Sequence, residues 1–287
     1  MRRFVILSTT ILVAGCAGTT STPPSVALLT DYGTTDAYAG VLAGAVLRNC
    51  PDAHLITITH QVTPFDIVEG SYLLARASRE FPEHTIFVAV VDPGVGTQRR
   101  SIVLRTRAGR LYVGPDNGLF TGVVRDQGLD RAWEITDESL LRPGALSATF
   151  HGRDIYGPVG GLLASGFPPR RVGPEIGDPV MLPAHEPART AGKITGQIVH
   201  VDHYGNLITN IPARWLSDTF SKKTPTVSVL VEQQSRPATW ARTYADVPPG
   251  SLVVLPNAEG LVEIARNAAS AAELLGARAG SQVQIHH

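Results

Sequence analysis

The segment TIFVAVVDPGVGT, residues 85–97, decides the fold. Its first seven residues are an almost uninterrupted apolar run, and Asp92 with a glycine-rich loop follows directly. A continuous apolar run of this length is typical of a strand in a parallel sheet that is covered on both faces. The segment therefore predicts a central strand that ends in a polar loop.

The chain before this segment alternates between the periodicities of strands and helices. Apolar runs predict strands, and apolar residues at helical spacing predict helices between them. The expected elements are, in order, residues 26–29, 37–47, 55–59, 67–81 and 85–91. This βαβαβ order predicts an α/β domain with a parallel sheet between helices.

The chain after this segment adds elements to that sheet and then leaves it. Residues 101–105 and 110–113 flank an Ala-Gly turn and predict a hairpin appended to the sheet. Residues 152–164 return to a helical pattern. The composition then shifts to Pro and Gly over residues 166–187, as in a linker.

Short β-like runs follow the linker, and they are residues 194–201, 207–211, 226–231 and 252–255. Because no long helix accompanies them, they predict a small antiparallel β barrel or sandwich. We therefore expect three parts: a leader and tether at residues 1–24, an α/β domain at 25–180 and a β-rich domain at 181–287.

Charge and cysteine content exclude several classes of protein. The 25 Lys and Arg residues balance the 25 Asp and Glu residues, so no overall field attracts nucleic acid. The two cysteines, Cys16 and Cys50, lack the spacing of a zinc site. We predict no nucleic-acid partner and no metal.

The first residues match a secretory signal. Two arginines precede an apolar run, residues 4–14, which is too short to span a membrane. The sequence Val-Ala-Gly-Cys resembles the lipobox of bacterial lipoproteins, which implies lipidation of Cys16. An ordinary cleaved signal is the alternative. Ala17 in place of an aspartate favours the outer membrane, so the expected location is the cell envelope, lipid-anchored and facing the periplasm.

Four polar clusters stand where apolar runs end or a helix begins, and they are residues 30–33, 92–97, 114–118 and 151–154. Ligands collect beyond the carboxyl ends of strands in open parallel sheets. Asp31 could bind a diol such as ribose or cap a helix. His151, with Arg153 and Asp154 beside it, could carry a proton or lie next to an ion pair.

In this order the clusters resemble the S-adenosylmethionine hydroxide adenosyltransferases, relatives of the S-adenosylmethionine-dependent fluorinase. The resemblance covers about residues 27–270 and implies hydrolysis of S-adenosylmethionine to adenosine and methionine, with no cofactor. It implies that Asp92, Arg99 and His151 position and activate water. The fluorinase carries Tyr in place of that Asp and Ser in place of Gly152, so the resemblance is to the water-using branch.

The resemblance also implies where the substrate binds. Asp31 would bind the ribose hydroxyls, and Phe65 would form an apolar wall near the ribose. The β-rich domain would contribute Asp202 and Asn206 from a turn and the backbone of residues 266–268, from Arg266 to Ala268, near the adenine. Relatives often carry Asn-Ser where this chain has Asn257-Ala258, which puts a contact to the methionine carboxylate in doubt.

Relatives of this kind form homotrimers whose sites lie between the first domain of one subunit and the second domain of its neighbour, so we expect a similar assembly. Two other functions remain open. One is a lipoprotein that binds S-adenosylmethionine or adenosine-like nucleosides without chemistry. The other is halogenation, which is disfavoured because the Asp92 carboxylate would repel a halide.

Overall fold

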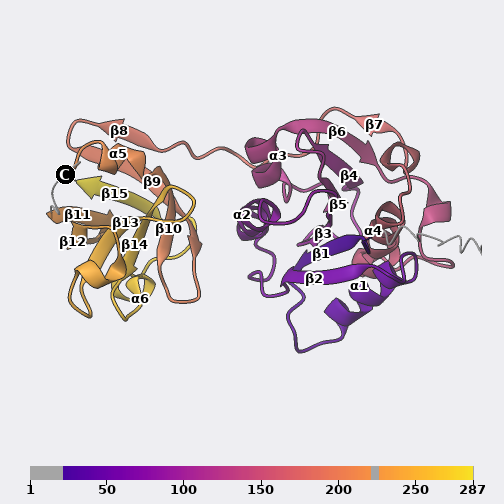
Figure 1. Ribbon diagram of the computed structural model, residues 1–287, viewed down its shortest axis with the longest axis horizontal. Helices are drawn as coiled ribbons and strands as arrows, with labels where there is room; N and C mark the ends of the chain where they lie inside the picture. Colours follow the sequence, from indigo (N-terminus) through magenta and orange to yellow (C-terminus); the bar gives the residue numbers. More distant parts are fainter. Residues whose placement is uncertain (1–21, 221–225, 287) are drawn as a thin grey trace, which may run out of the picture.

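The computed structural model describes residues 22–220 and 226–286. Cys16 and the expected leader lie outside this range. Two bodies are joined by a single extended segment, residues 177–187 (Figure 1). No helix in the described residues is long and apolar enough to cross a membrane.

The first body is built on a seven-stranded sheet in the order β2-β1-β3-β5-β4-β6-β7. Its strands are β1 (Ser25–Thr30), β2 (His54–Thr59), β3 (Ile86–Val90), β4 (Ser101–Thr106), β5 (Leu111–Pro115), β6 (Leu129–Glu134) and β7 (Glu175–Ile176). β2, β1, β3 and β5 are parallel, whereas β4, β6 and β7 run antiparallel to their neighbours. The α/β prediction is confirmed.

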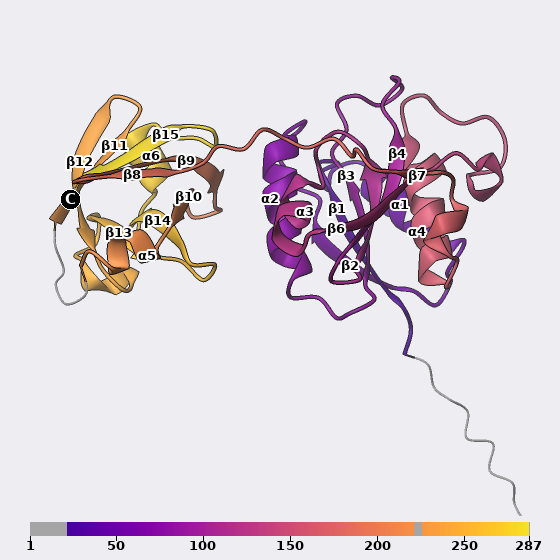
Figure 2. The ribbon, with the colours of Figure 1, turned by 90° about the horizontal axis from the view of Figure 1, so that it is seen from above.

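Helices cover both faces of this sheet, as Figure 2 shows. They are α1 (Tyr38–Leu47), α2 (Ile67–Ser78), α3 (Thr121–Gln127), a π-helical turn η2 (Gly152–Tyr156), α4 (Gly157–Ala164) and the 3₁₀ turns η1 (Glu138–Leu140) and η3 (Pro169–Arg171). Successive residues of β1 point to opposite sides: Val26 packs towards α1 and α4, and Ala27 towards α2 and α3. This explains why the strands are apolar without alternation.

The predicted hairpin forms and is appended to the parallel strands through β5. β4 and β5 pair antiparallel, and β5 lies inside the sheet beside β3 rather than beyond β4. The register pairs Ile86 with Leu111 and Val88 with Val113. Burial favours this position, because β5 is as apolar as its parallel neighbours.

The second body is a closed β-barrel, which selects the barrel from the two expected alternatives. Its strands are β9 (Lys193–Val201), β10 (Leu207–Pro212), β11 (Thr226–Val231), β12 (Gln234–Trp240), β13 (Leu252–Pro256), β14 (Leu261–Arg266) and β15 (Gln282–His286), with β8 (Ala188–Thr190) added beside β9. Pairing of β10 with β9 closes the ring. The strands are antiparallel except for β12 and β13, which are parallel.

Short helices accompany the barrel: α5 (Arg214–Ser217), α6 (Ala271–Leu275) and the 3₁₀ turn η4 (Tyr244–Asp246). The barrel encloses its own apolar core, with fully buried Ile194, Val229 and Ile264. It meets α2 through His200, whose ring stacks on Tyr72 with centroids 5.4 Å apart.

The close packing of α4 against α1 depends on a glycine of α4. A Cβ at Gly161 would lie 2.3 Å from the backbone oxygen of Val46, whereas a Cβ at Gly44 of α1 meets nothing within 4 Å. We expect Gly161→Ala to lower the free energy of unfolding by about 1–3 kcal/mol through overpacking. Gly44→Ala should raise the free energy of unfolding by about 0.5–1 kcal/mol, because alanine leaves the unfolded chain fewer backbone conformations at this position than glycine does. Urea unfolding midpoints measure both, and equal effects would contradict the packing argument.

Candidate active site

The carboxyl ends of β1 and β3 open into a cavity of about 480 Å³. Its walls come from four segments that are far apart in the sequence: residues 31–38, 64–65, 90–95 and 147–153. Asp31 follows β1 and Asp92 follows β3 by one further residue, so adjacent parallel strands deliver both carboxylates to the same edge. Residues of the first, second and fourth polar clusters therefore meet at this cavity.

Asp92 lines the cavity and forms a bidentate ion pair with Arg99 behind it. Arg99 Nε donates to Asp92 Oδ1 at 2.9 Å, and Arg99 Nη2 donates to Asp92 Oδ2. The side chains are 6 % and 10 % exposed, so water screens the pair poorly. Such a bidentate contact between a guanidinium and a carboxylate fixes the orientation of both groups.

Further contacts hold the guanidinium of Arg99 in place. Nη1 donates to Ser101 Oγ at 3.0 Å and to the backbone oxygen of Arg100 at 3.3 Å. The Tyr156 ring lies under it, 5.6 Å from Cζ, and the Tyr156 hydroxyl hydrogen-bonds Ser101 Oγ at 3.2 Å. The sequence analysis missed Ser101 and Tyr156, because a strand serine and a helical tyrosine carry no motif.

His151 completes this group through its Nδ1 atom, which lies 2.7 Å from Arg99 Nη2. A guanidinium has donors only, so Nδ1 must accept and the proton of the neutral ring resides on Nε2. Burial and then the charge of Arg99 lower the pKa of His151, although Asp92 and Asp154 oppose the shift. His151 is therefore neutral at pH 7.

Asp31 shapes the opposite wall of the cavity. Its Oδ2 accepts the backbone N–H of Phe65 at 2.9 Å. Phe65 has a φ of 70°, an uncommon conformation for a bulky residue, and its side chain is 71 % exposed. Burial raises the pKa of Asp31, with a smaller contribution from Asp92. The helix-capping alternative is wrong, because the residue that caps α1 is Ala37.

A close backbone contact and a set of hydrogen bonds fix the loops that carry these residues. Gly96 has a φ of 78°, and a Cβ there would meet the backbone oxygen of Ala148 at 2.5 Å, so the glycine-rich loop packs directly on the loop before His151. Asp154 is fully buried and accepts from Ser147 N at 2.7 Å and Arg153 Nε at 2.6 Å. Burial opposes its ionisation, but these bonds lower its pKa to about 2.

The third cluster has a structural role in the described residues. Asp116 is buried, pairs with Arg100 and accepts the N–H of Val180 at 2.7 Å. Asn117 Nδ2 donates to the backbone oxygen of Val91 at 2.9 Å. This cluster ties the end of β3 to β5 and to the segment that leaves the sheet.

The site residues expected on the barrel do not line this cavity. Asp202 Oδ1 accepts the N–H of Asn206 at 2.8 Å, and Asn206 Nδ2 donates to Asp202 Oδ2 at 2.9 Å, which closes the β9–β10 turn. Arg266 ends β14, with Nε on the Gly250 oxygen at 2.8 Å, and Ala268 has a φ of 57°. One chain therefore carries the two expected groups of site residues separately.

The Asn257-Ala258 pair lies in the β13–β14 turn. Asn257 Oδ1 accepts the N–H groups of Glu259 and Leu261, at 3.0 and 2.9 Å. Its Nδ2 is buried without a hydrogen-bond partner. Asn257 therefore orders the turn whichever residue stands at 258.

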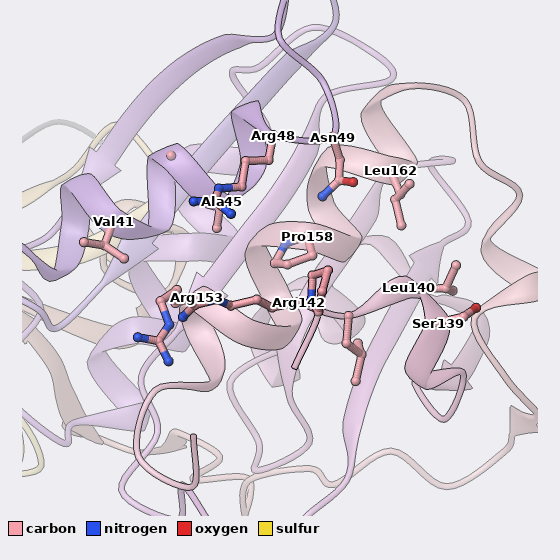
Figure 3. Close-up of a pocket in the computed structure, with 13 residues that line it drawn as sticks. Val41, Ala45, Arg48, Asn49, Ser139, Leu140, Arg142, Arg153, Pro158 and Leu162 are labelled. Atoms are coloured by element: carbon pink, nitrogen blue, oxygen red, sulfur yellow. The ribbon is translucent and has the colours of Figure 1, made fainter. Parts of the chain in front are cut away.

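A larger cavity, about 660 Å³, lies between α1, α4 and residues 139–143 (Figure 3). It contains Arg48, Arg142 and Arg153 but none of the three residues Asp92, Arg99 and His151. Size alone would misplace the active site. In the described part of the chain, no group of three or more His, Cys, Asp or Glu side chains could hold a metal ion.

The fold and site define an α/β protein with an acid–base set at the carboxyl edge of a parallel sheet, followed by a β-barrel. Residues 26–173 match the family model of the S-adenosylmethionine hydroxide adenosyltransferase N-terminal domain, and residues 196–284 match its C-terminal domain. The chain belongs to this family.

Known proteins resemble the chain over nearly its whole length. The (R)-S-adenosyl-L-methionine hydrolase of Salinispora arenicola is 38 % identical, with 91 % of this chain and 97 % of the relative covered. A fluorinase of Actinoplanes sp. is 29 % identical over 91 % of this chain and 97 % of its own. The crystal structure of an uncharacterized conserved protein from Thermotoga maritima is 37 % identical, with a TM-score of 0.87 and coverage of 91 % and 100 %.

The contact between Arg99 and His151 predicts how the pKa of the imidazole responds to its neighbours. Asp92→Asn removes a charge that raises this pKa and should lower it further, whereas Arg99→Gln should raise it. NMR titration of the ring nitrogens measures both shifts and should show the Nε2–H tautomer. His60, whose pKa is lowered by burial, is the internal control. Unchanged values for His151 in both variants would contradict the assigned contacts.

Proposed function

We propose that this protein hydrolyses S-adenosylmethionine to adenosine and methionine by attack of water at C5′ of the ribose. The observation that carries the proposal is that Asp92 and His151 line the cavity and that Arg99 connects them through hydrogen bonds to both. The relatives named as hydrolases support it, because they align over 91 % of this chain. The fluorinase likeness is weaker support for halogenation, because a carboxylate at 92 repels halides.

The chemistry of the substrate explains why so few groups are needed. A lone pair of water forms the C5′–O bond as the C5′–S bond breaks, and the electron pair of that bond goes to sulfur. Methionine leaves as a neutral thioether, so no acid and no separate cofactor is required. Positioning of water in line with the C–S bond is then the main task, and orientation supplies about 7–11 kcal/mol in favourable cases.

The tautomer of His151 assigns the proton. Because Arg99 occupies Nδ1, the Nε2–H of the neutral ring donates to the water oxygen rather than removing its proton. Asp92 retains lone pairs beyond its two bonds to Arg99 and takes the proton. A weak base suffices, because the attacking oxygen becomes strongly acidic as the C–O bond forms. Arg99 holds the carboxylate in a fixed orientation.

The remaining predicted residues would bind the substrate. The Asp31 carboxylate lines the cavity and would bind the ribose hydroxyls, with Phe65 as the wall beside them. Asp202, Asn206, and the backbone from Arg266 to Ala268 would come from the barrel of a neighbouring subunit in a trimer. Exposure of the aromatic side chains of Phe65 and Tyr204, 71 % and 75 %, supports such an interface.

The location is part of the same proposal. Lipidation of Cys16 would anchor the mature protein to the outer membrane, facing the periplasm, and residues 18–24 would serve as a tether. The relatives' names specify the (R) sulfonium, so both sulfonium epimers of S-adenosylmethionine should be tested as substrates. Tight binding of either epimer without products would favour the alternative of a binding lipoprotein.

Asp92→Ala tests the chemistry. With protein that begins after Cys16, we expect adenosine and methionine from the wild type and a kcat lower by about 10²–10⁴ in the variant, the range of proton-transfer catalysis. The Kd of adenosine should change little, because Asp92 acts in the transition state. The matched control is Asp130→Ala, which removes the carboxylate of an exposed pair with Arg105. Chromatography measures the products, and parallel losses of turnover and binding would refute the assignment.

Mixing two inactive variants tests the assembly. Asp92→Ala impairs only the α/β domain and Asp202→Ala only the barrel, so a mixed trimer contains some interfaces with both groups intact. Co-refolding equal amounts should restore about a quarter of wild-type activity if subunits combine at random in closed rings. No recovery in trimers verified by light scattering would place both groups of residues in one subunit.

A further inference from the structure

Tyr32 presents a hydroxyl to the cavity that no protein group satisfies. The residue follows Asp31 directly, and its backbone N–H donates to Thr30 Oγ1 at 3.1 Å. Its ring makes an edge contact with Phe150, with centroids 5.9 Å apart at 73°. Tyr32 lines the cavity, and across residues 22–220 and 226–286 the hydrogen bonds of Tyr32 include its backbone N–H but not its hydroxyl. A polar atom placed in this way is available to a ligand or to water.

The position of this hydroxyl is fixed by Gly152. A Cβ built on Gly152 would lie 2.3 Å from Tyr32 Oη, closer than real Cβ contacts. Gly152 directly follows His151, so Tyr32 Oη lies against the backbone beside the imidazole. The hydroxyl therefore occupies the space that any other residue at 152 would need.

The surroundings keep this hydroxyl protonated. Burial raises the pKa of Tyr32, and the nearby Tyr156, Asp31 and Asp92 raise it further, against the opposing charge of Arg99. A neutral phenol both donates and accepts hydrogen bonds. Tyr32 lines the same cavity as Asp92 and His151.

We propose that Tyr32 is a positioning residue whose hydroxyl oxygen accepts a hydrogen bond from the attacking water. The inference rests on the proposed hydrolysis and deepens it. Water has two protons and two lone pairs. One proton is transferred to Asp92, the Nε2–H of His151 donates to one lone pair, and Tyr32 Oη accepts a hydrogen bond from the other proton, which stays on the oxygen. One lone pair remains, and it points at C5′.

This arrangement explains why residue 152 is glycine. A side chain there would displace Tyr32 Oη and leave the second proton of water without a fixed acceptor. The attacking lone pair would then sample many directions, which lowers the rate without changing how the adenosine part binds. Tyr32 and Gly152 therefore act as a pair.

The experiment compares Tyr32→Phe, Gly152→Ala and the double variant with the wild type in the hydrolysis assay. Tyr32→Phe keeps the ring and should lower kcat about tenfold, as expected for one neutral hydrogen bond. KM and the Kd of adenosine should stay within twofold of wild type. Gly152→Ala should lower kcat by a similar factor. The double variant should be no slower than either single variant, because both changes remove the same contact.

Tyr112→Phe is the matched control. It removes a buried phenol hydroxyl, which donates to Gln127 at 3.3 Å on the opposite side of the sheet, and should leave kcat unchanged. Unfolding midpoints and adenosine binding show that every variant is folded.

The outcomes separate the two proposals. Wild-type protein that produces no adenosine from either epimer refutes the hydrolysis and with it the inference. Active wild-type protein with an equally active Tyr32→Phe variant refutes the role of Tyr32 alone. Losses that multiply in the double variant, or a loss that appears in KM and adenosine affinity, also overturn it.

Discussion

The permanent charge of Arg99 is the constraint on which the site depends. A guanidinium offers donors only, and here they are divided between the Asp92 carboxylate, the Ser101 hydroxyl and His151 Nδ1. These contacts orient the carboxylate and leave the imidazole one possible neutral tautomer. A lysine could supply the charge but not the planar set of donors, so the acid–base properties of the cavity depend on the shape of one side chain.

The sheet brings these groups together because they follow strands that end at the same edge. β1 and β3 are adjacent and parallel, so Asp31 and Asp92 emerge at one edge from buried, rigid strands. The loop with His151 reaches the same place because Asp154 anchors it from below and Gly96 allows the neighbouring loop to pack on it. Rigid elements thus support every group in the proposed chemistry, whereas the substrate-facing wall around Phe65 is a loop.

The sequence predicted the parts of the fold that burial dictates. Continuous apolar runs identified β1 and β3, and the turn between β4 and β5 identified a hairpin. The position of β5 beside β3 could not be predicted, because it depends on contacts between distant segments. β12, with the sequence QSRPATW, was missed because half-exposed barrel strands tolerate polar residues and proline.

The same distinction applies to the site. Asp92, Arg99 and His151 were predicted from motif resemblance, and the structure brings them into contact. Asp116 looked equivalent to Asp92 in the sequence, yet it has a structural role, because it pairs with Arg100 and accepts the N–H of Val180. These contacts come from distant segments and could not be predicted from the sequence. Tyr32 gave no signal, since an aromatic residue after a strand is usually core. The roles of the barrel residues remain predictions.

The hydrogen bond between Asp31 and the Phe65 backbone limits how this cavity can change during evolution. One carboxylate holds a left-handed loop residue and also lines the cavity. Any replacement of Asp31 would alter the polarity of the floor and the shape of the wall in a single mutational step. A lineage acquiring a new substrate would more readily change residue 65, whose side chain is exposed, than residue 31. Changes in specificity should therefore begin at residue 65, at the exposed edge of the cavity, and leave Asp31 unchanged.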